Sequence, residues 1–394
     1  MAPWSTTTLA AQAELVRERV DPRREPATAY VGLEHIHAGA LTLGQPGDSG
    51  KVASACFRHG AGDVLFGRLR PNLRKVVRAP FPGLCTTEAW VLRPRPQVDP
   101  DFFFYALANP DFAALCVRSA EGTRMPRARW DYVSSVPLPW PGPAEQRRIA
   151  AALAPLDARI ALNRRMNQTL QALFRAQFDR VVRPPATGNE RWRRVTLDDL
   201  AFPHRVTVGP DTVAPDLACI GLAHLDRDRL ALERWGRAGD AASPKAALER
   251  GDLLFGRLRP GFKKVAIAPV DGLCSTDILV IRPRSPELRA LALGWLSHTS
   301  FIAHAVSVCT GTRMPRASWS ALSAFPVVVP PPEVLERFQA SAAPLLQRLV
   351  LNVRQDRALA QLRDALLPGL MSGRVRIRPA PAQRESPRRM VPIT

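Results

Sequence analysis

The sequence lacks several features that define common classes of protein. It has no apolar run long enough to cross a bilayer, and its first twenty residues contain no apolar signal-peptide core. Its six cysteines form no C-x-x-C pair, and none has a histidine at zinc-finger spacing. We therefore expect a cytoplasmic protein that has no membrane partner, no disulfides and no structural zinc.

Familiar catalytic and cofactor-binding motifs are also missing. No glycine-rich dinucleotide fingerprint or Walker loop is present, and GDSGK at 47–51 lacks the spacing that cradles phosphates. NPDF at 109–112 is superficially like the Asn-Pro-Pro-aromatic loop of adenine methyltransferases but has only one of its prolines. His35 and His224 lie in apolar, strand-like runs, which favours a structural over a catalytic role. We expect no catalytic centre, metal or cofactor in this chain.

Lysine is scarce, yet the chain is strongly basic. Its formal net charge is +20 with a sequence pI of about 11.1, and lysine stands only at 51, 75, 245, 263 and 264. A GC-rich genome would exchange lysine for arginine but would not create such a positive surplus. The charge predicts a polyanionic partner, with nucleic acid favoured over an anionic membrane surface.

Much of the chain is written twice. DVLFGRLRPNLRKVVRAPFPGLCTTEAWVLRPRP at 63–96 matches DLLFGRLRPGFKKVAIAPVDGLCSTDILVIRPRS at 252–285, with 20 identities in 34 positions and no gap. The same offset, 252 − 63 = 189 residues, relates GTRMPRARW at 122–130 to GTRMPRASW at 311–319. A period this long indicates a duplicated domain with its connector, since solenoid repeats are much shorter.

Each copy mixes the signals of strands and helices. DVLFGRL and LCTTEAWVLRPR alternate like strands, whereas 99–120 and its counterpart 288–308 are typical of helices. The sequence therefore predicts an α+β fold with two homologous α/β domains. We place domain 1 at 1–142, a central helical spacer at 143–182, domain 2 at 183–332, a second helical spacer at 333–372 and a flexible basic tail at 373–394.

Both spacers carry apolar residues at steps of three and four, the pattern of a helix-pairing seam. Polar residues recur at the centre of each seam, which favours two helices paired in a fixed register, a buried Asn contacting its counterpart, over a lone amphipathic helix on a globular surface. The candidate helix-pairing residues are Leu156, Ile160, Asn163, Asn167, Leu345, Leu349, Asn352 and Asp356.

The order of these pieces resembles a known family. YVGLEHI, DVLFGRLRP with a downstream lysine, GTRMPRARW, VPLPWPGPAEQRRIAAAL and a long helix follow one another, and most of this order recurs in the second half. The chain thus resembles the specificity subunit of type I restriction-modification systems over nearly its whole length. One departure is that VVVPPPEVLERF replaces the Pro-x-x-x-Glu-Gln-x-x-Ile signature that PGPAEQRRI preserves in the first copy.

That resemblance implies a function, an assembly and a set of partners. It implies two target-recognition domains on double-stranded DNA, each reading one half of a bipartite site, and an antiparallel coiled coil that spaces them. It also implies two methyltransferase subunits and endonuclease-translocase subunits as partners, on which S-adenosylmethionine, ATP and Mg²⁺ are expected. A helix of about 36 residues spans roughly 54 Å, enough to hold half-sites about 34 Å apart.

The duplication also helps to sort the basic residues by role. Two domains that read different half-sites must differ where they touch bases, while phosphate contacts can stay identical. Base readers are then expected where the copies diverge, at 37–60 against 226–249 and at 97–121 against 286–310. The candidate DNA-binding residues, identical in both copies, are Arg68, Arg70, Lys75, Thr123, Arg124, Arg127, Arg257, Arg259, Lys264, Thr312, Arg313 and Arg316.

Three alternatives remain open from the sequence. The arginines of RLRP could simply face solvent at the end of a strand, whereas the Gly-Thr-Arg loop is the better candidate for binding. The chain could be a self-sufficient DNA methyltransferase or nuclease. It could also be a structural adaptor whose positive charge is incidental.

Overall fold

The computed structural model describes residues 4–184, 191–209, 213–240 and 243–377, which divide into two compact units. Unit 1 comprises Met1–Asp157 and Ala360–Thr394, and unit 2 comprises Ala158–Leu359. The predicted basic tail, 373–394, lies outside the described residues from 378 onward.

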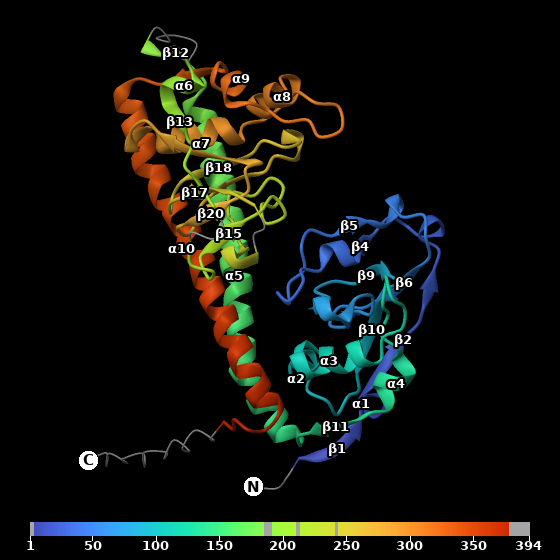
Figure 1. The fold of residues 1–394 in the computed structure, drawn as a ribbon. Coiled ribbons are helices and arrows are strands. Elements are labelled where there is room, and N and C mark those ends of the chain that lie inside the picture. Colours follow the sequence, from blue (N-terminus) through green and yellow to red (C-terminus); the bar gives the residue numbers. More distant parts are fainter. Residues whose placement is uncertain (1–3, 185–190, 210–212, 241–242, 378–394) are drawn as a thin grey trace, which may run out of the picture. The chain divides into compact units, whose positions relative to one another are not determined.

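Unit 1 is a mixture of short strands and helices (Figure 1). Its strands are β1 (Ser5–Thr8), β2 (Ala13–Val16), β3 (Arg19–Val20), β4 (Ala29–Val31), β5 (Gly47–Asp48), β6 (Cys56–His59), β7 (Val64–Gly67), β8 (Val76–Arg78), β9 (Gly83–Thr86), β10 (Ala89–Pro94) and β11 (Pro137–Trp140). Its short helices are α1 (Leu9–Gln12), α2 (Pro100–Ala108), α3 (Pro110–Arg118) and α4 (Trp130–Ser135).

Unit 2 is built from the same kinds of element. Its strands are β12 (Arg193–Thr196), β13 (Ala201–His204), β14 (Thr207–Val208), β15 (Ala218–Ile220), β16 (Gly236–Arg237), β17 (Lys245–Leu248), β18 (Leu253–Gly256), β19 (Val265–Ile267), β20 (Gly272–Cys274), β21 (Ile278–Pro283) and β22 (Pro326–Val329). Its short helices are α6 (Leu197–Leu200), α7 (Arg289–Ser297), α8 (Thr299–Ser307) and α9 (Trp319–Ser323).

The sheets of unit 2 repeat those of unit 1 strand for strand. Unit 1 has a pair β1-β11, a four-stranded sheet β2-β10-β7-β8 and a five-stranded sheet β3-β6-β9-β4-β5. Unit 2 has β12-β22, β13-β21-β18-β19 and β14-β17-β20-β15-β16 in the same orders. The expected mixture of helix and sheet is therefore confirmed, and the duplication seen in the sequence recurs in the topology.

The repeat is one residue out of step at its N-terminal edge. Arg19 pairs with Phe57 in unit 1, and Thr207 pairs with Ala246 in unit 2. The offset is 207 − 19 = 188 on the first strand and 246 − 57 = 189 on the second. Positions before β4 are therefore matched at an offset of 188, and later positions at 189.

The helical stretches expected within each copy are each broken in two. α2 and α3 meet at Asn109, which has an extended ψ of 135° before Pro110 and whose side chain accepts from the backbone N–H of Asp111. A residue before proline is pushed out of the α region, so the break lies where the sequence places it. His298 makes the corresponding break between α7 and α8 without a proline.

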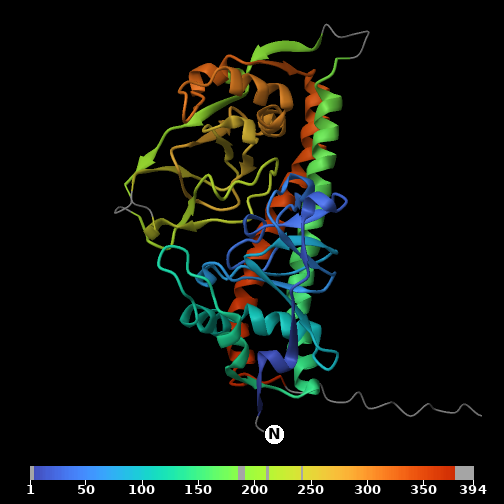
Figure 2. The same ribbon diagram turned by 90° about the vertical axis from the view of Figure 1, so that its right-hand side faces the viewer.

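Two long helices, α5 (Pro143–Val181) and α10 (Pro332–Met371), lie side by side in both ribbon views (Figures 1 and 2). In unit 2 the Nδ2 of Asn163 donates to Asp356 at 2.7 Å, and that of Asn352 donates to Asn167 at 2.9 Å. Residue numbers rise along one helix as they fall along the other, so the two segments run antiparallel. In the repeat Asn163 corresponds to Asn352 and Asn167 to Asp356, and the sequence suggested that these counterparts would contact each other. The structure instead pairs Asn163 with Asp356 and Asn167 with Asn352.

The apolar part of the seam differs in detail from the predicted set. Ile160 and Leu349 are buried as expected, but Leu156 and Leu345 are only half-buried. Leu346 and Val353 carry the seam on α10, at 6% and 1% exposure. Around the polar layer several helical positions fit the spacing of a seam residue equally well. Periodicity alone therefore could not show that Leu346, and not Leu345, is buried in the seam.

In unit 1 the two helices are held by a buried arginine. The Arg363 side chain is 1% exposed, and its Nη1 donates to Asp157 at 2.6 Å while its Nε and Nη2 donate to Asp364. The second oxygen of Asp157 accepts from the hydroxyl of Tyr105 on α2. A charge removed from water needs such pairing, so these contacts fix the helical segments of unit 1 against its α/β body.

None of the helices within the described residues is both long enough and apolar enough to span a membrane.

Candidate nucleic-acid interface

The two repeated motifs of unit 1 that the sequence singled out fold against each other. The backbone N–H of Arg70 donates to the Pro126 carbonyl at 2.7 Å, and that of Ala128 donates to the Arg68 carbonyl at 2.9 Å. Leu69 and Arg127 form the β-bridge between these two bonds. We call this pair of loops, residues 68–70 and 126–128, the clasp of unit 1.

An acidic residue holds this clasp closed. Glu88 accepts from Nε and Nη2 of Arg127, the latter at 2.8 Å, and lies 3.6 Å from Nε of Arg68. The guanidinium of Arg127, and next to it that of Arg68, keep the pKa of the Glu88 carboxyl below its usual range. Two donor nitrogens of Arg127 are bound to Glu88. The Arg127 guanidinium therefore holds the loop in place and is less available to bind a ligand.

Backbone strain marks the same place. Arg70 and Arg74 have φ values of 50° and 48°, in the left-handed region that side chains other than glycine seldom adopt. The hydrogen bond from Arg70 to Pro126 holds this conformation, and Nη2 of Arg74 donates to the Ala108 carbonyl at the end of α2. Strain of this kind persists where the surrounding structure overdetermines it, which is common at binding sites.

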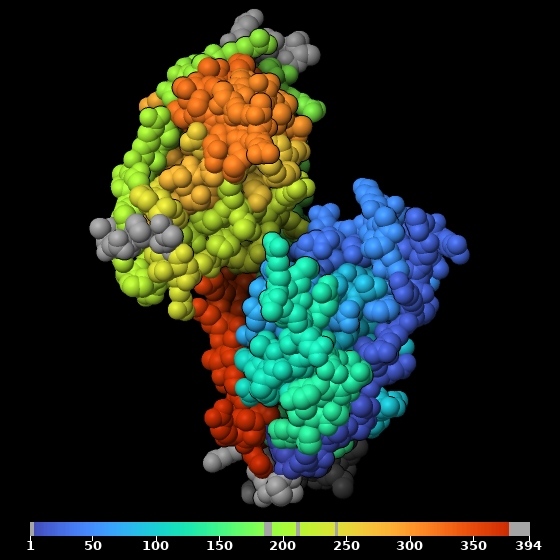
Figure 3. Space-filling view, turned by 45° about the vertical axis from the view of Figure 1, so that its right-hand side comes forward, coloured from blue at the N-terminus to red at the C-terminus, as the bar shows by residue number. Residues whose placement is uncertain are grey.

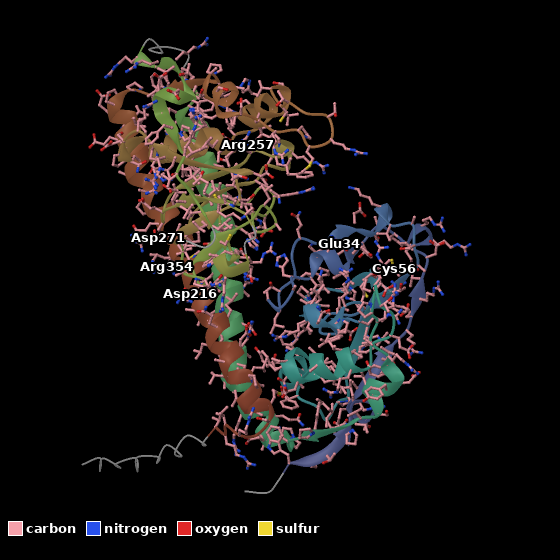
Figure 4. The ribbon with its side chains drawn as sticks, in the orientation of Figure 1. Glu34, Cys56, Asp216, Arg257, Asp271 and Arg354 are labelled. Carbon is pink, nitrogen blue, oxygen red and sulfur yellow. The ribbon has the colours of Figure 1, made fainter. Side chains whose placement is uncertain are left out.

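Unit 2 repeats the whole arrangement. Arg259 donates from its backbone to Pro315 at 2.9 Å, and Ala317 donates to Arg257 at 3.0 Å, so residues 257–259 and 315–317 form the clasp of unit 2. Asp277 takes the place of Glu88 and accepts from Nε of Arg316 at 2.7 Å. Arg259 and Lys263 are left-handed, with φ of 51° each. The Arg257 side chain can be located in Figure 4.

The predicted DNA-binding residues fall into groups with different freedom. Arg127 and Arg316 are bound by carboxylates, as described above. Nζ of Lys75 donates to the Leu33 carbonyl, and Nζ of Lys264 donates to the Leu222 carbonyl. Burial lowers the pKa of both lysines. The lysines thus fasten YVGLEHI and its counterpart to the sheet, a geometry that does not favour the phosphate contact predicted for them.

The remaining cations of the set point outward. Nη2 of Arg70 donates to the carbonyl of Arg124, and Nη2 of Arg259 donates to that of Arg313. All four of these arginines are exposed, and so are Thr123 and Thr312 at the loop tips. Among the described residues none of these arginines has a carboxylate within ion-pair distance, so each unit presents two uncompensated guanidinium groups beside its clasp. Part of that surface of unit 1, around residues 110–140, is the turquoise area of Figure 3.

The repeated histidines have a structural role. Nδ1 of His35 accepts from the backbone N–H of Gly32 at 2.9 Å, and His224 does the same for Gly221 at 2.9 Å. Each therefore closes a short turn, as the sequence interpretation favoured. Burial, together with nearby arginines, lowers the pKa of His224, which keeps its ring neutral as this hydrogen bond requires.

A cleft opens beside the clasp in each unit. That of unit 1 has a volume of about 680 Å³ and that of unit 2 about 380 Å³. Four lining residues are the same in both: Arg17 and Arg205, Arg68 and Arg257, Thr87 and Thr276, and Trp130 and Trp319. Arg17 and Arg205 are exposed, and in the described parts of the chain no carboxylate pairs with them.

Sequence reasoning missed several of these residues. Glu88 and Asp277 stand at the repeat offset of 189 and are both acidic, a signal that could have marked this position, although not the arginine that it binds. Arg17 and Arg205 were hidden because their offset is 188. No grouping of three or more His, Cys, Asp or Glu side chains in the described ranges is arranged to hold a metal ion.

Comparisons with known proteins agree with this geometry. Residues 54–172, which contain the clasp of unit 1 and the first part of α5, match the family model of the type I restriction modification DNA specificity domain. The chain is 24% identical over 161 residues to the type I restriction enzyme EcoDI specificity subunit of Escherichia coli, a match that covers 39% of this chain. It spans only 35% of the length of that relative.

A longer match reaches into both units. Over 313 residues, 72% of this chain and 71% of the relative, it is 20% identical to the type I restriction enzyme MjaIX specificity subunit of Methanocaldococcus jannaschii. A crystal structure of the S subunit of a type I restriction-modification system from M. genitalium shares the fold, with a TM-score of 0.53 at 14% identity, covering 94% of this chain and 99% of that one.

Residues 54–172 are thus similar to a DNA specificity domain, and the chain has the fold of an S subunit. The curated relatives that it matches are specificity subunits of type I restriction-modification systems. The resemblance drawn from the repeated motifs is thereby confirmed.

Proposed function

We propose that this chain is the DNA-binding specificity subunit of a type I restriction-modification complex. Unit 1 reads one half of a bipartite site in double-stranded DNA, and unit 2 reads the other. The observation that carries the proposal is the clasp, which occurs once in each unit with the same exposed arginine pair beside it. Two copies of one binding device suit a site with two parts.

The charge of the interface supports DNA as its ligand. Arg70 and Arg124, with Arg259 and Arg313, extend from loops that are braced by the clasps. Arginines on rigid loops suit phosphate oxygens, which fix a protein on the duplex without reading its sequence. The net charge of +20 extends this attraction beyond direct contact.

The paired helices provide the spacer of the proposed complex. Segments of α5 and α10 are bonded through Asn163 and Asp356 and through Asn167 and Asn352, which supports an antiparallel coiled coil of fixed register. Such a coiled coil would set the length of the unread gap between the half-sites.

In this proposal the chain is not itself an enzyme. Two methyltransferase subunits and the endonuclease-translocase subunits supply the chemistry and hold S-adenosylmethionine, ATP and Mg²⁺. The competing proposal, a self-sufficient methyltransferase or nuclease, is tested by incubating the purified full chain with DNA, S-adenosylmethionine and Mg²⁺. We expect neither methyl transfer nor cleavage, and either activity would contradict the assignment.

The decisive experiment maps the recognised sequence. The chain is co-expressed with a modification subunit of its own operon, and methylated adenines of the host genome are located by sequencing. We expect one bipartite motif whose two halves are separated by a gap of constant length. A continuous motif, or methylation that is independent of this chain, would overturn the proposal.

The spacer can be tested with the same assay. Inserting seven residues at facing positions of α5 and α10 keeps the seam in phase and lengthens each helix by about 10 Å. We expect both half-sites to stay unchanged while the gap grows by about three base pairs. An unchanged gap would show that the helices do not set it.

A further inference from the structure

The two clefts beside the clasps have the same frame but different walls. Their shared residues are two arginines, a threonine and a tryptophan, at matched positions of the two units. The differing residues, given as unit 1 then unit 2, are Leu15 and Pro203, Arg19 and Thr207, Phe57 and Ala246, Trp90 and Leu279, Arg129 and Ser318, and Asp131 and Ser320. Differences at so many matched lining positions suit a surface that must recognise two different ligands.

The sharpest difference lies on one pair of neighbouring strands. In unit 1 Arg19 of β3 is the cross-strand partner of Phe57 of β6. In unit 2 the matched residues Thr207 of β14 and Ala246 of β17 are partners in the same way. Because backbone pairing is identical, only the side chains change, and a long cation beside an aromatic ring is exchanged for two small side chains.

The cations of the unit 1 cleft are not equally available. Nη1 of Arg129 donates to Glu121 at 2.6 Å, and Arg68 and Arg127 face Glu88. Arg19 is exposed, and no carboxylate of the described chain lies within ion-pair distance of it. Among the described cations of the unit 1 cleft, Arg19 therefore combines two properties. No described carboxylate pairs with it, and the matched residue of unit 2, Thr207, carries no charge.

We propose that these clefts distinguish the two half-sites, with Arg19 selecting a G·C base pair for unit 1. A guanidinium can donate two parallel hydrogen bonds to O6 and N7 of guanine in the major groove. At the matched position of unit 2, Thr207 and Ala246 offer a hydroxyl and methyl groups, which suit an A·T pair through the thymine methyl. The shared arginines, Arg17 and Arg205, grip the phosphates alike in both units. This inference rests on the proposed function.

The test uses binding of the full chain to duplexes that carry the mapped site with one base pair changed at a time. Replacing Arg19 by the residue of unit 2, Arg19→Thr, should reduce the preference for G·C at one position between about 5-fold and about 150-fold. The other half-site should be read as before. The reciprocal Thr207→Arg should raise the preference for G·C in the opposite half-site.

Arg17→Ala is the matched control, because it removes a cation from the shared frame of the same cleft. It should weaken binding to every duplex alike and reduce the slope of log K against log salt by about 0.9. Thermal unfolding shows whether each variant is folded. Because Arg17 and Arg19 are exposed, their replacement should leave the unfolding temperature unchanged.

Three results would overturn the inference. Arg19→Thr could weaken all duplexes equally, as a phosphate contact would, or leave every preference intact. It could also change the same half-site as Thr207→Arg. If the unsubstituted chain fails to discriminate between any duplexes, the proposed function itself fails, which is a distinct result because it needs no variant.

Discussion

Asn163 and Asp356 meet at the centre of the paired helices of unit 2, where Nδ2 of Asn163 donates to Oδ1 of Asp356 at 2.7 Å. The other side-chain oxygens of the pair, Oδ1 of Asn163 and Oδ2 of Asp356, are buried and lack a hydrogen-bond partner among the described residues. A proton on Oδ2 of Asp356 would turn one of these two acceptors into a donor. Burial raises the pKa of Asp356 to about 6, in keeping with such a proton.

The first prediction concerns pH and this pair. The pKa of Asp356 is about 6 when folded and 3.8 in its reference state, so the folded protein holds the proton more tightly. Its contribution to the free energy of unfolding is complete below pH 4 and is lost as pH rises through 6. Asp356→Asn carries its own donor, so at pH 8 it should be more stable than the unsubstituted protein by up to about 3 kcal/mol.

Urea unfolding of both proteins from pH 4 to pH 8 measures this difference. It should be largest at the upper end and close to zero at the lower end. Asp216→Asn serves as the control, since Asp216 is exposed and has no ion-pair partner among the described residues, so it should leave the free energy of unfolding nearly unchanged at every pH. A gap between Asp356→Asn and the unsubstituted protein that is equal at all pH values would refute the protonated pair.

The second prediction concerns Arg363 in unit 1. Burial alone would lower its pKa, but the carboxylates of Asp157 and Asp364 outweigh that effect and raise it, so it stays charged. Asp157→Ala removes the nearer of the two carboxylates and leaves Nη1 of the buried guanidinium and the Tyr105 hydroxyl without this acceptor, which should lower the free energy of unfolding by up to about 3 to 5 kcal/mol. Adding Arg363→Met to that variant should recover much of the loss. If the double variant is less stable than Asp157→Ala alone, the loss of stability does not come from the unpaired charge of Arg363.

How much of this could be predicted from the sequence depends on the kind of information involved. The duplication revealed the α+β units, the long helices and both clasp motifs. Identities at a constant offset can be read from the sequence without knowing how the side chains pack. The spacing of apolar residues did not decide whether Leu345 or Leu346 lies in the seam between the helices. Contacts between distant residues, such as that of Glu88 with Arg127, need the folded chain because 39 residues separate the partners.

The division of labour among the basic residues was also beyond the sequence. Arg124 and Arg127 stand in one short motif and have the same chemistry, yet one is exposed and the other is bound to Glu88. Lys75 looked like a free cation but donates to the carbonyl of Leu33. Only neighbours in space separate a cation that braces a loop from one that can meet a ligand.

The third prediction concerns the acid that closes each clasp. Glu88→Gln keeps the shape of the side chain but removes the charge that binds Arg127, so the loop should open more often. Hydrogen exchange of the backbone amides of Arg127 and Ala128 should become several-fold faster. Asp277→Asn should have the same effect on Arg316 and Ala317 in unit 2, and neither variant should alter exchange in the other unit.

This result separates bracing from direct binding. If Glu88→Gln tightens binding to DNA and leaves exchange unchanged, then the acid merely competes with phosphate for Arg127. The opposite pattern, faster exchange with weaker binding, is expected when the acid braces the loop.

The last prediction concerns the exposed arginines at the loop tips. Arg124→Ala and Arg313→Ala each remove one cation that no described carboxylate neutralises, so each should weaken binding to specific and random duplexes by the same factor. The slope of log K against log salt should fall by about 0.9 for each, because one fewer counterion is released. Arg191→Ala is the control, since Arg191 is equally basic but is paired with Glu333 at 2.7 Å. Its loss should leave both the affinity and the slope nearly unchanged. A change of preferred bases in Arg124→Ala, without the change of slope, would move this residue from the phosphates to the base edges.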